Sequence, residues 1–148
     1  MVDLRELRIV RLTNAIHGHI GIYSILGAKM GLYARDLLCY PISVLSFAGS
    51  KPPVSCLNDG LQIGSGATLG RGLIKLAETD APCAMARFEA NGKSLTLKLK
   101  DEYARRIQDD IRLGVERYGD SPAYWKYVRS LALKYWRQWD RKQIFDKS

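Results

Sequence analysis

The sequence predicts an α+β fold, in which helices near both ends pack with a small, largely antiparallel sheet. Three observations predict it: apolar residues recur at helical spacing in the first 38 residues and again after residue 101, apolar and polar residues alternate around Asn91-Gly92, and no internal repeat or linker interrupts the chain. The 148 residues have the size of one ordinary domain, so we expect residues 1–148 to share a single core.

Two helices are predicted at the N-terminal end. Apolar residues near helical spacing, with arginines between them, predict an amphipathic helix over residues 3–16 that ends at Gly18. Steps of three and four residues predict a second helix over residues 22–38. Its Gly27 and Gly31 share one face, and because glycine lowers helix stability, we expect another backbone to approach that face closely.

The sheet is predicted in the middle of the chain. Pro41 ends the second helix, and the apolar run over residues 42–47 is typical of a short strand. The clearest β signal comes from residues 84–90 and 94–100, which flank Asn91-Gly92. This dipeptide is the typical two-residue turn of a β-hairpin.

Two further helices are predicted after the hairpin. Apolar residues repeat every four positions behind an acidic first turn that begins at Asp101, and Gly119 supplies a stop. Ser121 and Pro122 form an N-cap and first-turn proline pair. They predict a last helix that runs to about Asp140.

The composition excludes several classes of protein. Hydrophobic residues make up 47% and charged residues 26%, which is ordinary for a globular domain. We find no signal peptide and no apolar run of about 18 residues, so we expect a cytoplasmic protein that does not enter the membrane. Cys39, Cys56 and Cys83 are too scattered for a disulfide framework. The net charge of +8 is spread along the chain, which argues against a nucleic-acid partner.

Both histidines of the chain lie in the run His17-Gly18-His19, at the predicted end of the first helix. Side chains two residues apart on a helix point about 200° from each other, so these imidazoles can face one ion only if the helix ends between them. Gly18 permits such an end. The run is therefore a candidate metal site, and a cap or core position for the histidines is the alternative.

Cys56 stands at the start of a short helix predicted over residues 56–63. We expect the peptide dipoles at a helix N-terminus to lower the pKa of a thiol there. Asp59 lies three residues further on along the same face, so both side chains can face a common pocket. The alternative is a buried small side chain beside a capping carboxylate.

A glycine-rich stretch follows over residues 64–72. Backbone amides in such turns can form anion-binding nests. The glycine spacing does not match a dinucleotide-binding motif, and Arg71 is followed by glycine where a phosphate loop carries Lys and then Ser or Thr. We therefore expect a tight loop that lines a pocket.

Three segments read together resemble the core domain of the formylmethanofuran dehydrogenase E-type subunit family. Residues 17–31 resemble the signature His-Gly-His-Leu-Cys-Pro-Gly followed by Gly-x-Arg-Met-Gly. Residues 56–62 resemble Cys-x-x-Asp-Ala-Ile-Gln, and residues 66–72 resemble Gly-Cys-Thr-x-Gly-Lys-Gly. The predicted hairpin occupies the place of the family's hairpin, and the resemblance covers roughly residues 5–100.

This resemblance implies an α+β core that is commonly a homodimer, with a cleft that can hold a divalent transition metal, zinc in the first place. It implies His17, His19 and Cys56 as metal ligands and Cys56 with Asp59 as catalytic candidates. The remaining polar groups of the two motifs are the candidates for contacting a cofactor: Gln62, Thr68 and Arg71.

The departures from the family pattern matter for function. Gly21 stands where the family carries the cysteine after His-Gly-His, and Ala67 replaces the cysteine before Thr68. Two soft ligands or nucleophiles are therefore missing. The expected function is metal or cofactor binding, as an accessory subunit or a stand-alone relative in redox or metal-cofactor metabolism. We do not expect a molybdopterin catalyst, since no such domain is present.

Two other functions stay open. One is a small metal-dependent enzyme that acts on an anionic substrate through a metal-bound water or Cys56. The other is a module that binds nucleic acid or an acidic partner through the aromatic and basic residues of the last helix. Those aromatic residues also trace helical stripes, and stripes of this kind ordinarily dock on a core or on a second subunit.

Overall fold

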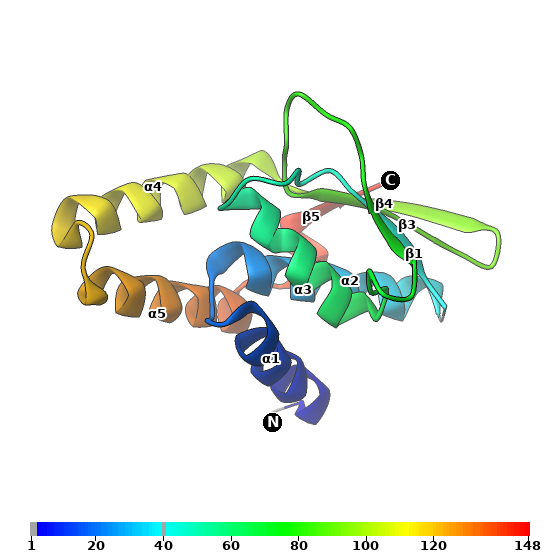
Figure 1. The fold of residues 1–148 in the computed structure, drawn as a ribbon, viewed down its shortest axis with the longest axis horizontal. Helices are drawn as coiled ribbons and strands as arrows, with labels where there is room; N and C mark the ends of the chain where they lie inside the picture. The colour runs from blue at the N-terminus through cyan, green and yellow to red at the C-terminus, as the bar shows by residue number, and fades with distance from the viewer. Residues whose placement is uncertain (1–2, 40) are drawn as a thin grey trace.

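The computed structural model describes residues 3–39 and 41–148 and has the predicted α+β class (Figure 1). Its helical segments are α1 (Leu4–His17), α2 (Ile22–Leu38), the 3-10 turn η1 (Val54–Cys56), α3 (Leu57–Ser65), α4 (Asp101–Tyr118), α5 (Pro122–Gln138) and α6 (Arg141–Ile144). Its strands are β1 (Ser43–Ser46), β2 (Ile74–Leu76), β3 (Met85–Ala90), β4 (Lys93–Leu99) and β5 (Phe145–Lys147). None of the described helices has the length and apolar character that crossing a membrane requires.

The strands form a five-stranded sheet in the order β2-β1-β3-β4-β5, and all neighbours except β1 and β2 are antiparallel. The predicted hairpin is present, and both Asn91 and Gly92 have positive φ, as a type I′ turn requires. Alternate residues of β3 and β4, such as Phe88 and Leu97, are fully buried. They cover one side of α2, which packs against both strands.

Strands β2 and β5 and the short helix α6 were not predicted. Helix α5 ends at Gln138, close to the predicted end near Asp140, and α6 and then β5 follow it. The described chain therefore ends on a strand that pairs with β4, not on a helix. The physical reason is length: a three-residue strand with one buried residue, Phe145 in β5, is too short to show an alternating pattern.

Helix α1 has the predicted bounds within one or two residues, but its buried residues differ from the apolar stripe seen in the sequence. Ile9 and Thr13 face the rest of the molecule, whereas Leu4 and Ile16 are exposed. In Figure 1, α1 projects from the body of the fold. It makes its contacts chiefly with α2 and α3, so only a narrow face of the helix is covered.

Helices α2 and α3 cross at glycines. A Cβ atom on Gly27 would lie 2.1 Å from the carbonyl oxygen of Leu57, and one on Gly60 would lie 1.9 Å from that of Ser24. No side chain fits at such distances, since the obstructing atoms belong to the backbone. The close approach predicted for Gly27 and Gly31 is thus confirmed, and its partner is α3.

The buried Lys29 joins α2 to the end of α5. Its ammonium Nζ donates to the carbonyl oxygens of Trp136 at 2.7 Å and of Trp139, and it lies 5.2 Å from the ring centroid of Trp136. These are carbonyl groups that a helix end leaves without intrahelical donors. Burial lowers the pKa of Lys29 to about 8, although the charge of Glu6 acts in the opposite direction.

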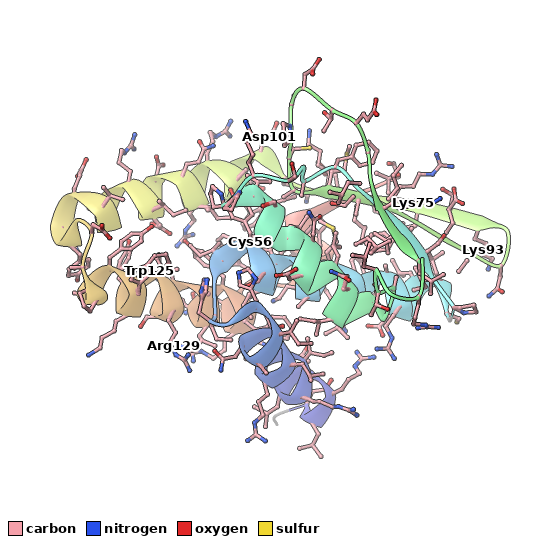
Figure 2. All side chains as sticks on the ribbon, viewed as in Figure 1. Cys56, Lys75, Lys93, Asp101, Trp125 and Arg129 are labelled. Carbon is pink, nitrogen blue, oxygen red and sulfur yellow. The ribbon has the colours of Figure 1, made fainter. Side chains whose placement is uncertain are left out.

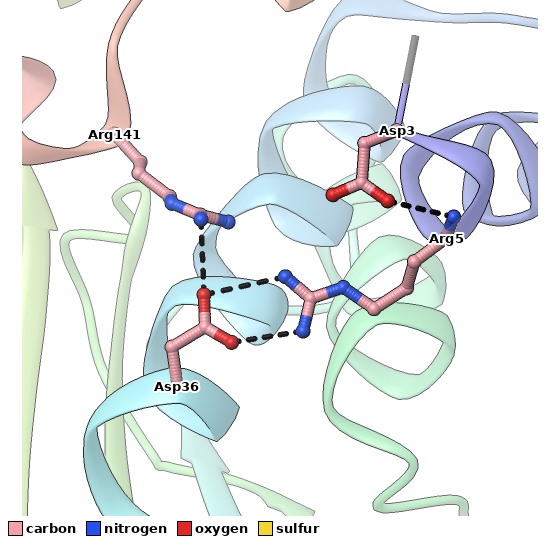
Figure 3. A network of polar contacts seen from close by, with 4 residues as sticks. All are labelled: Asp3, Arg5, Asp36 and Arg141. Carbon is pink, nitrogen blue, oxygen red and sulfur yellow. Dashed lines mark hydrogen bonds and ion pairs between the residues drawn. The ribbon is translucent and has the colours of Figure 1, made fainter. Parts of the chain in front are cut away.

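An ion-pair network ties three helices together at the surface (Figure 3). Asp36 of α2 accepts from Arg5 of α1 at 2.9 Å and pairs with Arg141 of α6 at 3.0 Å. Asp3 caps α1 by accepting from the backbone N–H of Arg5 at 2.8 Å. Because these groups are partly exposed, each pair contributes at most about 1 kcal/mol, and the main effect is to position α1.

Candidate functional site

A cavity of about 320 Å³ lies where the turn between α1 and α2 meets the start of α3 and the facing helices α4 and α5. The side chains of His17, His19 and Cys56 line it. The rest of the wall is mainly apolar or aromatic and includes Ile22, Tyr23, Ile111, Tyr124, Trp125 and Val128. An apolar cavity with a few polar groups on one wall is the usual form of a small-molecule site.

The polar end of the cavity is organised around His17, which Asp59 contacts although Asp59 itself, unlike Cys56, does not line the cavity. His17 is the last residue of α1, and Asp59 lies in the first turn of α3. The His17 Nδ1 lies 2.6 Å from the Asp59 Oδ2. An ionised carboxylate only accepts hydrogen bonds, so Nδ1 carries a proton and donates; in the neutral form of the ring, Nε2 is then an acceptor.

The second nitrogen of His17 has no hydrogen-bond partner within the described part of the chain. The His17 side chain is 10% exposed, and its Nε2 is buried without a hydrogen bond among the described residues. A buried polar atom left in this way costs about 1–3 kcal/mol. A ligand that offers a donor or a metal ion to Nε2 would remove this cost.

His19 lies beside His17 because the helix ends between them. Gly18 has φ of 89° and caps α1 by donating to the carbonyl of Asn14, so the chain reverses there as predicted. The two imidazole centroids are 4.7 Å apart, and the His19 ring meets the edge of Trp125 at 5.6 Å. Two imidazoles therefore stand side by side at the cavity wall.

The thiol of Cys56 lines the cavity, but its pKa shift is opposite to the predicted one. Burial raises the pKa of Cys56, and the negative charge of Asp59 raises it further; a backbone hydrogen bond lowers it by less. The prediction of a thiol activated by the helix N-terminus was therefore wrong. The dipole of a short helix does not outweigh desolvation and a carboxylate three residues away.

We accordingly expect Cys56 to be a slow nucleophile. At pH 8 it should react with iodoacetamide more slowly than the exposed Cys39, and Asp59→Asn should accelerate it because that substitution removes one cause of the raised pKa. Peptide mapping by mass spectrometry measures both rates in one sample. Equal rates at the two thiols of the wild-type protein would contradict the expectation.

The other predicted contact residues lie beyond this cavity, in and beside the glycine-rich loop. Gln62 accepts from the backbone N–H of Leu69 at 2.8 Å, and Arg71 donates to the carbonyl of Gly66 at 2.9 Å. The carbonyl of Thr68 accepts from the N–H of Leu73 at 3.2 Å. These bonds hold the loop together, and none of the three residues lines the cavity. Their contact with a cofactor stays a prediction.

The chain was compared with models of known protein families. Residues 16–146 match the model described as FmdE, molybdenum formylmethanofuran dehydrogenase operon. This chain belongs to the FmdE family. The match includes the turn with both histidines, the start of α3 and the C-terminal helices, so it extends beyond the segments that carry the sequence resemblance. None of the curated proteins with which the chain was compared matches it.

Within the FmdE family pattern, the two departures are accommodated without strain. Gly21, in place of the signature cysteine, has φ of −111° and ψ of 163°, which any residue adopts. A Cβ there would lie 3.0 Å from Cε1 of His19, so a side chain at this position would touch that imidazole. Ala67 is fully buried in the hydrophobic core.

For the metal implied by the resemblance to this family, His17 is oriented as a ligand, but the described residues do not form a complete metal site. His17 has the arrangement of a metal-binding histidine: a carboxylate holds one nitrogen, and the other has no hydrogen-bond partner among the described residues. In residues 3–39 and 41–148, however, no group of three or more His, Cys, Asp or Glu side chains is placed to hold an ion. His19 and Cys56 line the same cavity but would have to move toward a metal bound at His17.

Sequence reasoning missed the contribution of α5 to the cavity. Tyr124, Trp125 and Val128 line it, whereas the sequence placed the aromatic residues of this helix in stripes that dock on a core or on a second subunit. That prediction is right for Tyr135 and Trp139, which are buried. Trp125 is 54% exposed, and no local sequence pattern distinguishes it from the buried Tyr135 and Trp139.

Proposed function

We propose that this FmdE-family protein binds a metal ion or a small cofactor in the cavity beside His17, as an accessory or stand-alone member of redox or metal-cofactor metabolism. The observation that carries the proposal is the state of the His17 ring. Its Nδ1 is held by Asp59 at 2.6 Å, and its buried Nε2 has no partner in the described structure. An oriented imidazole therefore stands at the wall of a cavity, and its Nε2 can accept when the ring is neutral.

The chemistry of His17 follows from its carboxylate. Asp59 fixes the tautomer and ring orientation and makes Nε2 a better electron-pair donor. Nε2 can accept a hydrogen bond from a cofactor or bind a divalent ion, for which zinc is the first candidate. A bound ion would supply a positive centre that polarises an oxygen atom of a ligand. Recruitment of Cys56 would require loss of its thiol proton, so metal affinity should rise with pH.

His17→Ala should abolish zinc binding, and Asp59→Asn should weaken it about 10- to 100-fold, because the amide no longer provides a charged partner for Nδ1. We would purify the wild-type protein without chelators, measure its metal content by elemental analysis, and titrate the metal-free protein with zinc by calorimetry. Asp80→Asn removes an exposed carboxylate elsewhere and serves as the matched control.

The outcome also separates the two versions of the proposal. Stoichiometric metal that is lost in His17→Ala supports the metal version. A metal-free wild-type protein that does not bind zinc, but retains a small molecule lost in His17→Ala, supports the cofactor version. If neither metal nor small molecule depends on His17, the proposed function is overturned.

A further inference from the structure

A second hollow adjoins the cavity on the outer side of α5. It encloses about 380 Å³ and is lined by His19, Ile20, Pro122, Trp125, Lys126 and Arg129. His19 and Trp125, whose rings contact each other, also line the first cavity, so the two spaces are neighbours that share these residues. Figure 2 shows Trp125 and Arg129 on α5, on the side of the molecule away from the β3–β4 hairpin.

The two hollows differ in charge. Both walls are mainly apolar, but the second also carries two cationic residues. Lys126 and Arg129 stand three residues apart on α5, where helix geometry places them on one face. Both are exposed, and neither forms an ion pair with a carboxylate of the described residues. A ligand lying across Trp125 would therefore meet an apolar space on one side and unpaired positive charge on the other.

The exposure of Trp125 agrees with this arrangement. A tryptophan that is 54% exposed at the junction of two hollows offers a flat surface on which a ring can stack. Its edge contact with His19 orients the indole. Lys126 follows Trp125 directly, and Arg129 lies one turn further along α5. Ring stacking and charge recognition would therefore come from the same helix.

From these observations we infer that the site takes an aromatic anion: a flat ring system beside Trp125 in the apolar cavity, with an acidic group held by Lys126 and Arg129. This inference rests on the proposed function, because it names the class of small molecule that the cavity beside His17 would accept. The acidic group can be a carboxylate, phosphate or sulfonate, since all three are recognised by the same charge-assisted hydrogen bonds.

Two dyes with the same rings but different charge test the inference. Anilinonaphthalene sulfonate carries a negative charge, and phenylnaphthylamine is its neutral counterpart. Both gain fluorescence in apolar surroundings, so titration gives their affinities. We expect the anionic dye to bind the wild-type protein more tightly, with an advantage that falls as salt is added. Either bound dye should protect Cys56 from alkylation while the exposed Cys39 continues to react.

The decisive variant is Lys126→Gln/Arg129→Gln, which should weaken the anionic dye about tenfold and leave the neutral dye unchanged. Its matched control is Lys134→Gln/Arg137→Gln, which removes two exposed cations of α5 at the same three-residue spacing. That control should leave both dyes unaffected. All four positions are exposed, and circular dichroism of each variant checks that the fold is retained.

Two results would overturn the inference and are distinguishable from each other. If the neutral dye binds and protects Cys56, but both double variants hold the anionic dye equally well, the anion site is wrong and the cavity stands. If neither dye protects Cys56, the cavity takes no aromatic ligand, and the cofactor version of the proposed function loses its support as well.

Discussion

Gly60→Ala should prevent folding or lower the free energy of unfolding by more than about 3 kcal/mol. The added Cβ would lie 1.9 Å from the carbonyl oxygen of Ser24 and 2.5 Å from the backbone nitrogen of Ala28. Both atoms belong to α2, so the only relief is to separate two helices at the centre of the core. Urea denaturation followed by circular dichroism, together with the yield of soluble protein, measures the effect.

Gly70→Ala is the matched control. A Cβ on Gly70 would meet no heavy atom within 4 Å, and its backbone is outside the left-handed region. We expect its stability to stay within about 0.5 kcal/mol of the wild-type value. If Gly60→Ala were as stable as Gly70→Ala, the two helices could not cross as closely as described here. Because α3 carries Asp59, any separation would also move the partner of His17.

Lys29→Ala should lower the free energy of unfolding by about 3–5 kcal/mol. The substitution removes the buried stem and leaves carbonyl groups of Trp136 and Trp139 without their donor. Lys29→Met retains most of the packed stem and should lose less. Lys134→Ala truncates an exposed lysine of α5 and should have little effect. A loss equal to that of Lys134→Ala would show that Lys29 does not hold the end of α5.

The same lysine predicts a pH dependence. The pKa of Lys29 is about 8 in the folded protein, and its ordinary value is 10.5. Between pH 8 and pH 10.5 the unfolded chain therefore binds more protons than the folded protein does. The free energy of unfolding should therefore rise with pH in this window, by up to about 3 kcal/mol. The cost of the buried charge is fully present below pH 8. The stability of the wild type relative to Lys29→Met should accordingly increase from pH 7 to pH 10; a decrease would contradict the lowered pKa.

Much of the secondary structure could be predicted because its signals are local. The bounds of α2 are those expected from apolar spacing, and the hairpin turns at Asn91-Gly92, as predicted. Gly27 and Gly31 on one face of α2 also indicated that another backbone packs closely against that face. The parallel pairing of β1 with β2 could not be predicted in the same way, since three residues after a glycine-rich loop carry no periodic signal.

The residues of the candidate site could be predicted from the sequence, but the pKa of its thiol could not. His17, His19 and Cys56 were nominated from the sequence and line one cavity. The pKa of Cys56 was predicted with the wrong sign, because a local dipole argument omits the burial that the folded chain imposes. Lys29 had no role in the sequence prediction, since its acceptors lie more than a hundred positions away.

By itself the sequence determined which segments form the long helices and the hairpin strands, where α1 ends between two histidines, and to which family the chain belongs. Only the tertiary structure decided that Asp59 orients His17 across 42 positions and that α5 closes the cavity with Trp125. The reason is physical. Local periodicity shows which face of a segment is apolar, whereas the partner of that face, and hence the burial and charge around each side chain, depends on how all segments pack together.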